Sequence, residues 1–173
     1  KKMKKVSFAF LLLLVLLSNA AYSQSENSVV KAHNKNSVFI EALGHGCFYS
    51  LNYERKILGN ARFLTSGQIG ISYYGKGSGI VPLWMPILIN QSVSIRKNMF
   101  IEIGAGKIFR NDGVEHRDGT FQDDYQIEEW TFRLGYKHFF KNGKWLFKVA
   151  YTPIYQDKSD YIHWGGIAFG YRF

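Results

Sequence analysis

Histidines are the residues of this sequence best suited to acid–base or nucleophilic chemistry, but their neighbours do not support that role. A hydrolytic site needs a nucleophile, a base within hydrogen-bond reach of it, and an acid that orients the base. His138 is followed by two phenylalanines and His163 by Trp164 and Gly165, so neither is followed two residues later by a serine. We therefore predict that the chain is not an enzyme and needs no cofactor.

A second set of reactive residues is acidic and lies in one stretch, NDGVEHRDGTFQDD. It holds Asp112, Glu115, His116, Asp118, Asp123 and Asp124. Oxygen ligands suit calcium, but the spacing is not that of an EF-hand. The Asp-Gly pairs at 112–113 and 118–119 are typical of turns. We predict a solvated loop over 110–126 and no metal site, and calcium binding remains an open alternative.

The elements that position these residues are strands, because the sequence alternates between apolar and polar residues. In EEWTFRLGYKHF, the residues Trp130, Phe132, Leu134 and Tyr136 share one face. The next segment, WLFKVAYTP, alternates in the same way, and Asn142-Gly143 between the two is a strong hairpin signal. This turn places His138 opposite Phe147 and Tyr136 opposite Val149, so the apolar faces coincide.

The same analysis predicts eight strands, at 38–43, 47–57, 62–73, 81–96, 99–109, 127–140, 145–155 and 164–173. Most reach the length of about 9–11 residues that crosses a bilayer as a tilted strand. Short connections alternate with longer ones, and 44–46 is the exception. That asymmetry is typical of an outer-membrane barrel with short periplasmic turns and longer external loops.

One face of each predicted strand carries polar and charged residues. A barrel of eight strands is just wide enough to be filled by such side chains, and buried charges must be paired. We predict a lumen charge network of Glu41, Glu54, Arg96, Glu102, Arg133, Lys148 and Arg172, with Glu102 as the partner of Arg133. The register sets Lys137 opposite Lys148, and we expect Glu54, Glu102 or water to offset that like-charge pair.

The N-terminus indicates export. Lys4 and Lys5 precede an apolar run from Phe8 to Leu17, and Ala21-Tyr22-Ser23 offers small residues for cleavage, which is the order of a signal peptide. We predict a signal segment 1–23, a flexible lead-in 24–37 and a barrel 38–173. Loss of the four N-terminal lysines leaves 18 basic residues against 13 acidic ones, a net charge of +5 without a basic run. The single Cys47 excludes a disulfide framework.

The last strand, GGIAFGYRF, alternates through Ile167, Phe169, Tyr171 and Phe173. With the segments YSLNYERKI, FIEIGAG and KVAYTPIY, it resembles the small OmpX/OmpA-type outer-membrane β-barrel proteins over nearly all of 38–173. The resemblance implies an all-β, eight-stranded, antiparallel up-and-down transmembrane barrel of a Gram-negative bacterium. It also implies that Phe169, Tyr171 and Phe173 form a C-terminal signal read by the barrel assembly machinery. It implies no activity.

These observations predict a non-enzymatic outer-membrane protein with a structural or surface-interaction role and a polar, plugged lumen. A small porin-like channel and a lipid-modifying outer-membrane enzyme remain alternatives, as does a secreted soluble barrel of the lipocalin type. We expect outer-membrane lipid and the assembly machinery as partners, no nucleic acid, and a monomer. The sequence does not name the surface ligand.

Overall fold

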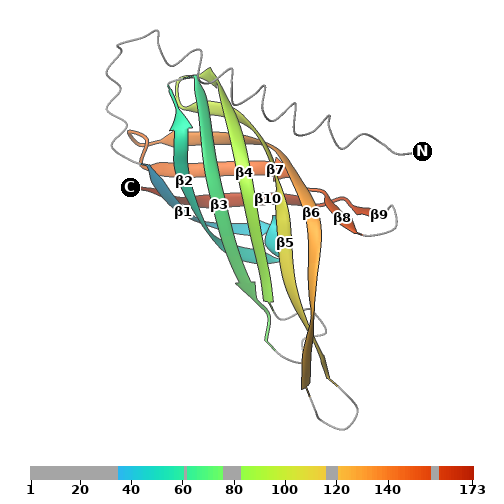
Figure 1. The fold of residues 1–173 in the computed structure, drawn as a ribbon. Helices are drawn as coiled ribbons and strands as arrows, with labels where there is room; N and C mark the ends of the chain where they lie inside the picture. The colour runs from blue at the N-terminus through green and yellow to red at the C-terminus, as the bar shows by residue number, and fades with distance from the viewer. Residues whose placement is uncertain (1–34, 61, 76–82, 116–120, 157–159) are drawn as a thin grey trace, which may run out of the picture.

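The computed structural model describes residues 35–60, 62–75, 83–115, 121–156 and 160–173 as a closed antiparallel β-barrel (Figure 1). The chain of pairings runs through the strands in sequence order and closes where the last strand, β10, pairs with β1. The strands are β1 (Asn36–Leu43), β2 (Tyr49–Gly59), β3 (Phe63–Tyr73), β4 (Leu83–Arg96), β5 (Met99–Glu115), β6 (Phe121–Phe140), β7 (Trp145–Tyr151), β8 (Ile154–Gln156), β9 (Asp160–Ile162) and β10 (Gly165–Arg172).

These ten segments make eight barrel strands. β6 pairs first with β7 and then with β8, so β7 and β8 are successive parts of one strand that is interrupted at Thr152 and Pro153. β9 pairs with β8 as β10 pairs with β7, so β9 and β10 also form one strand. Proline lacks the N–H that a ladder needs, which accounts for the first interruption. The predicted fold class is confirmed.

The hairpin between β6 and β7 has the predicted register. His138 pairs with Phe147, Tyr136 with Val149, and Lys137 with Lys148. The connecting residues 141–144 take positive φ at Asn142 and Gly143, as an Asn-Gly hairpin turn requires, and at Lys141 as well. Turn chemistry and the period-2 pattern therefore act together to set which side chains enter the barrel.

The predicted loop 110–126 is partly wrong, because β5 and β6 continue through most of it. Their ladder extends to the pair Glu115–Phe121, and the hairpin projects beyond the other strands in Figure 1. The register shifts between Asp112 and Val114, so the first Asp-Gly pair forms a bulge inside a ladder rather than a turn. The second Asp-Gly pair lies outside the described residues, as do the predicted signal segment and most of the lead-in.

Candidate functional site: a charge network in the barrel lumen

The interior of this barrel is polar and its outer surface is apolar. Glu102 and Arg133 are 1% and 2% exposed, whereas their apolar neighbours Ile103 and Leu134 are 51% and 56% exposed. The same alternation runs through β2, β3 and β4, where Asn52, Gln68 and Asn90 are buried. The arrangement is the reverse of a soluble barrel, which buries its apolar face, and the lipocalin-type alternative is therefore wrong.

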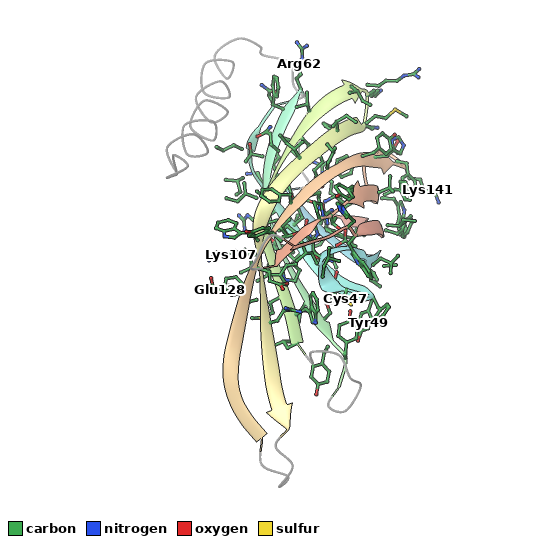
Figure 2. The ribbon with its side chains drawn as sticks, turned by 90° about the vertical axis from the view of Figure 1, so that its right-hand side faces the viewer. Cys47, Tyr49, Arg62, Lys107, Glu128 and Lys141 are labelled. Carbon is green, nitrogen blue, oxygen red and sulfur yellow. The ribbon has the colours of Figure 1, made fainter. Side chains whose placement is uncertain are left out.

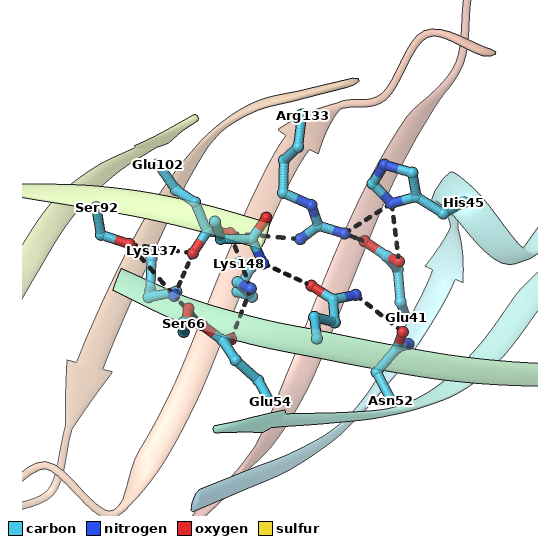
Figure 3. Close-up of polar contacts among 12 residues, drawn as sticks. Glu41, His45, Asn52, Glu54, Ser66, Ser92, Glu102, Arg133, Lys137 and Lys148 are labelled. Atoms are coloured by element: carbon cyan, nitrogen blue, oxygen red, sulfur yellow. Dashed lines mark hydrogen bonds and ion pairs between the residues drawn. The ribbon is translucent and has the colours of Figure 1, made fainter. Parts of the chain in front are cut away.

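Two lysines and two glutamates form the centre of the lumen (Figure 3). Lys137 and Lys148 are cross-strand neighbours on β6 and β7, and Glu54 and Glu102 reach them from β2 and β5. The nitrogen Nζ of Lys148 lies 2.9 Å from an oxygen of Glu54 and 2.8 Å from one of Glu102. Lys137 Nζ lies 2.6 Å from Glu54 and also contacts Glu102. Each lysine thus binds both carboxylates, and the like-charge pair is offset.

Hydroxyl groups complete this centre. The hydroxyl of Ser66 donates to Glu54, and that of Ser92 donates to Glu102 over 3.2 Å. Next to it, an amide ladder crosses three strands: Gln68 donates to Asn52 over 2.9 Å, and Asn90 donates to Gln68 over 3.0 Å. A polar group buried without a partner is costly, so these bonds make burial of the charged centre tolerable.

Arg133 forms the second part of the network. Its Nη2 donates to Glu41 over 2.6 Å and to Nδ1 of His45 over 2.9 Å. Its Nη1 lies 3.6 Å from Glu102, which links it to the lysine centre as an ion pair. The predicted partner Glu102 is therefore secondary: Glu41 holds the guanidinium, because β1 closes against β10 and brings Glu41 into the lumen.

His45 accepts from Arg133 through one ring nitrogen and donates through the other. Its Nε2 lies 3.2 Å from the carbonyl oxygen of Phe132, which cannot donate, so Nε2 carries the proton and Nδ1 accepts. His45 is fully buried in the lumen, and a proton on Nδ1 would remove the acceptor that Arg133 uses. The histidine is therefore a neutral link between the guanidinium and the β6 backbone.

The turn that carries His45 depends on glycine. It is a short 3₁₀ turn, η1 (Gly44–Gly46), whose residues are all buried. Gly44 has φ 78°, and a Cβ there would lie 2.7 Å from Cδ of Glu41. A side chain at this position would strain the backbone and displace the carboxylate that binds Arg133. The sequence Gly-His-Gly is thus explained by close packing around the network.

The network is balanced in charge. Three buried glutamates, Glu41, Glu54 and Glu102, face three buried cations, Arg133, Lys137 and Lys148, with His45 neutral. A further pair joins Arg110 to Glu129 over 2.6 Å near the middle of β6, farther from the turn with β7 than Arg133 is. Because paired charges avoid most of the desolvation penalty of isolated ones, this equality permits a dry, filled lumen.

The structure brings together five of the seven residues predicted for the network, places Arg172 at its edge beside a hollow that Glu54 also lines, and turns Arg96 away from it. Arg96 is exposed, because the register shifts between Ser94 and Arg96 and the bulge turns both Ile95 and Arg96 outward. Arg172 lies at the mouth of the lumen, with its guanidinium 4.7 Å from the ring centre of Phe139. Sequence reasoning already expected Glu54 or Glu102 beside Lys137 and Lys148, and both carboxylates lie there. It missed His45, which stands in a turn without alternation.

The residues of the predicted C-terminal signal, Phe169, Tyr171 and Phe173, point outward and are 49%, 41% and 51% exposed. Phe169 stacks on Trp145, with ring centres 5.2 Å apart, and Tyr171 packs edge-on against the same indole. Their role in assembly stays a prediction. Among the described residues, no helix is long and apolar enough to span a membrane, and no cluster of three or more His, Cys, Asp or Glu could hold a metal ion.

The barrel fold is also found in known proteins, although no family model and no curated protein matches the chain. Among solved structures, the N-terminal β-barrel domain of OprF from Pseudomonas aeruginosa matches with a TM-score of 0.53 at 15% identity. The outer-membrane protein Ail of Yersinia pestis, solved in a phospholipid bilayer nanodisc, matches with a TM-score of 0.51 at 11% identity. Each match covers 81% of this chain and 99% of the other.

The chain has the fold of the small outer-membrane β-barrels. The resemblance drawn from the strand patterns and the terminal aromatic residues is confirmed at the level of fold. In such barrels the outer face meets lipid and the inner face is polar, which is the arrangement of Leu134 and Arg133 here.

Proposed function

We propose that the protein spans the outer membrane of a Gram-negative bacterium as a non-enzymatic barrel with a closed lumen. Its role is structural, or it presents its outer loops to the surroundings for interaction. The predicted signal segment supports export. Exposed apolar side chains on the described strands support insertion into lipid, since soluble proteins rarely leave such a continuous apolar surface in water.

The observation that carries this proposal is the layering of the lumen. Phe39, Phe139, Leu146 and Ala168 form a buried apolar cluster at the end of the β6–β7 turn. Trp84, Ile108 and Ile154 form a second one farther from that turn. Along β6, the network residues Lys137 and Arg133 lie between Phe139 of the first cluster and Glu129, which pairs with Ile108 of the second. Ions crossing this barrel would have to pass two apolar layers and break ion pairs between them, which supports a plug.

The placement of the histidines supports a role without catalysis. His45 links Arg133 to a backbone carbonyl inside the network. His138 stacks between Tyr136 and Phe140 on the outer surface, and His163 lies 2.5 Å from the hydroxyl of Tyr151. None of these contacts is with a serine or cysteine that could serve as a nucleophile.

Conductance in planar lipid bilayers tests the closed lumen. We expect no discrete current steps from the refolded wild-type protein. The double variant F39A/L146A opens the apolar layer at the turn end, and E54Q/E102Q leaves two lysines unpaired. Regular single-channel steps in the wild type would refute the plug, and the two variants serve as controls for the detection of an opened path.

One observation favours the narrow channel as a second candidate. Within the described residues, Oε2 of Glu41, Oδ1 of Asn90, and Nε and Nη1 of Arg133 are buried without a hydrogen-bond partner. Buried polar atoms normally find a partner, so water molecules are expected beside them. A file of such waters that extended through both apolar layers would carry ions, and the same conductance measurement separates the two candidates.

A further inference from the structure

Basic residues gather at one end of the barrel. This end carries Asn60, Arg62 and the short turns 97–98 and 141–144, together with the N-terminal end of β1 and the C-terminal end of β10. Figure 2 shows Arg62 and Lys141 here, whereas Tyr49 and Cys47 lie toward the other end. The exposed basic residues of this end, called the basic rim, are Lys35, Arg55, Arg62, Arg96, Lys97, Lys141 and Lys144.

The basic rim is continuous around the barrel mouth. Backbone hydrogen bonds connect its segments in turn: Lys56 N to Lys35 O at 2.7 Å, Ser94 N to Arg62 O at 2.7 Å, Phe139 N to Asn98 O at 2.9 Å, and Arg172 N to Lys144 O at 2.7 Å. Half-buried Lys56 and Arg172 add to its charge, and these two line one hollow at the mouth together with Lys35 and the buried Glu54. The cations therefore form one positive surface.

The seven exposed cations of the rim have no ion-pair partner in the part of the chain that the structure describes, although the buried Glu54 lines the hollow beside Lys35, Lys56 and Arg172. The glutamates nearest to it in the lumen, Glu54 and Glu102, are buried and each already binds two lysines. Like charges gathered without counter-charges repel one another, so a bound external anion would reduce the repulsion between the rim cations.

The rim adjoins the lipid-facing surface, which identifies the source of the anion. Ile57, Ile95 and Phe173 are 59%, 59% and 51% exposed beside it. Trp145 lies immediately next to the turn that holds Lys141 and Lys144, with Phe169 stacked on it and Tyr171 edge-on against it. Aromatic residues with adjoining lysines are typical of the headgroup level of a membrane, where the aliphatic stem of lysine lies along the apolar surface and its ammonium group reaches the phosphates.

We propose that the basic rim binds the phosphate groups of anionic phospholipids in the periplasmic leaflet. This inference rests on the proposed function, because it requires insertion with the short turns on the periplasmic side. The barrel would then gather a shell of anionic lipid at that end. The ring of rim cations supplies the charge, and the aromatic cluster next to it sets the depth at which the headgroups sit.

Electron spin resonance of chain-labelled lipids tests the proposal. The protein is refolded into phosphatidylcholine vesicles, and the motionally restricted fraction is measured for labelled phosphatidylglycerol and labelled phosphatidylcholine. We expect the wild type to prefer phosphatidylglycerol by about two- to fivefold, since each basic residue near anionic lipid contributes and salt screens it. The variant R96Q/K97Q/K141Q/K144Q should lose most of this preference, and the charge-conserving R96K/K97R/K141R/K144R should keep it.

A pair of single variants and a separate measurement of insertion distinguish failure of the rim proposal from failure of the proposed function. K144Q removes an exposed rim lysine, whereas K107Q removes a lysine away from the rim that is paired with Glu128, and only K144Q should lower the preference. Heat-modifiable gel mobility reports insertion separately, so a protein that fails to insert contradicts the proposed function rather than the rim. Insertion without a preference, or an equal effect of K107Q and K144Q, overturns the rim proposal. So does rim-dependent binding to purified peptidoglycan sacculi without any lipid preference.

Discussion

Removing Arg133 alone should destabilise the barrel more than removing Arg133 together with Glu41. The guanidinium is held 2.6 Å from Glu41, and both side chains are buried. Changing Arg133 to Met leaves the network with three glutamates against two lysines and strands the carboxylate of Glu41. Breaking a buried pair in this way costs about 3–5 kcal/mol. The double variant R133M/E41Q removes both charges and should recover about 2 kcal/mol of that loss.

A double-mutant cycle of Arg133 with Glu102 should show a smaller coupling free energy than the cycle of Arg133 with Glu41. Glu102 lies 3.6 Å from Arg133 and binds Lys137 and Lys148 at the same time, so it keeps partners when Arg133 is lost. We expect a coupling free energy below about 1 kcal/mol for R133M with E102Q. Urea unfolding in lipid vesicles, followed by tryptophan fluorescence and gel mobility, measures both cycles. Costs for R133M and E41Q that add within about 0.5 kcal/mol would refute the assigned pairing, as would a larger coupling to Glu102.

Three further predictions concern the outer face, the long hairpin and the histidine. Changing Leu134 to Arg should cost about 2–4 kcal/mol of unfolding free energy in vesicles if the residue lies near the bilayer midplane. The control L134F should cost little. Equal effects of the two changes would mean that this face does not meet lipid. Replacing 113–123 by a short Gly-Ser turn should leave folding intact, because β4 pairs with β5 only as far as Asn111. A variant that fails to gain heat-modifiable gel mobility would show that the hairpin is needed for assembly. Protonation of His45 would remove the Nδ1 acceptor that Arg133 uses and place two cations side by side, so stability should fall as the pH drops. Urea midpoints at pH 8 and pH 5 should therefore differ less for H45Q than for the wild type, and an unchanged difference would exclude His45 as the cause.

The barrel and the orientation of its faces follow from local patterns in the sequence. Alternation places Arg133 and Leu134 on opposite faces wherever the strand lies, and Asn142-Gly143 sets the register of β6 on β7. These features depend only on neighbours along the chain or across one hairpin, and the structure agrees with them.

The partners across the lumen could not be assigned in the same way. Whether Arg133 meets Glu41 or Glu102 depends on the tilt and stagger of the closed barrel, which no single hairpin determines. Arg96 was misplaced because a bulge ends the alternation of β4 just before it. His45 was missed because it enters the lumen from a turn, where period 2 carries no information. The loop prediction failed because β5 and β6 support each other beyond the rest of the sheet.

Nuclear magnetic resonance with a lipid that carries a paramagnetic chain label tests the central claim, an apolar face toward lipid around a closed polar lumen. In detergent micelles or nanodiscs, methyl signals of Ile69, Ile103 and Leu134 should broaden, since these side chains are exposed on the outer face. Methyl signals of Leu88, Ile108 and Leu146, which are buried inside the barrel, should stay sharp. Broadening of the second set, or of neither set, would contradict the account.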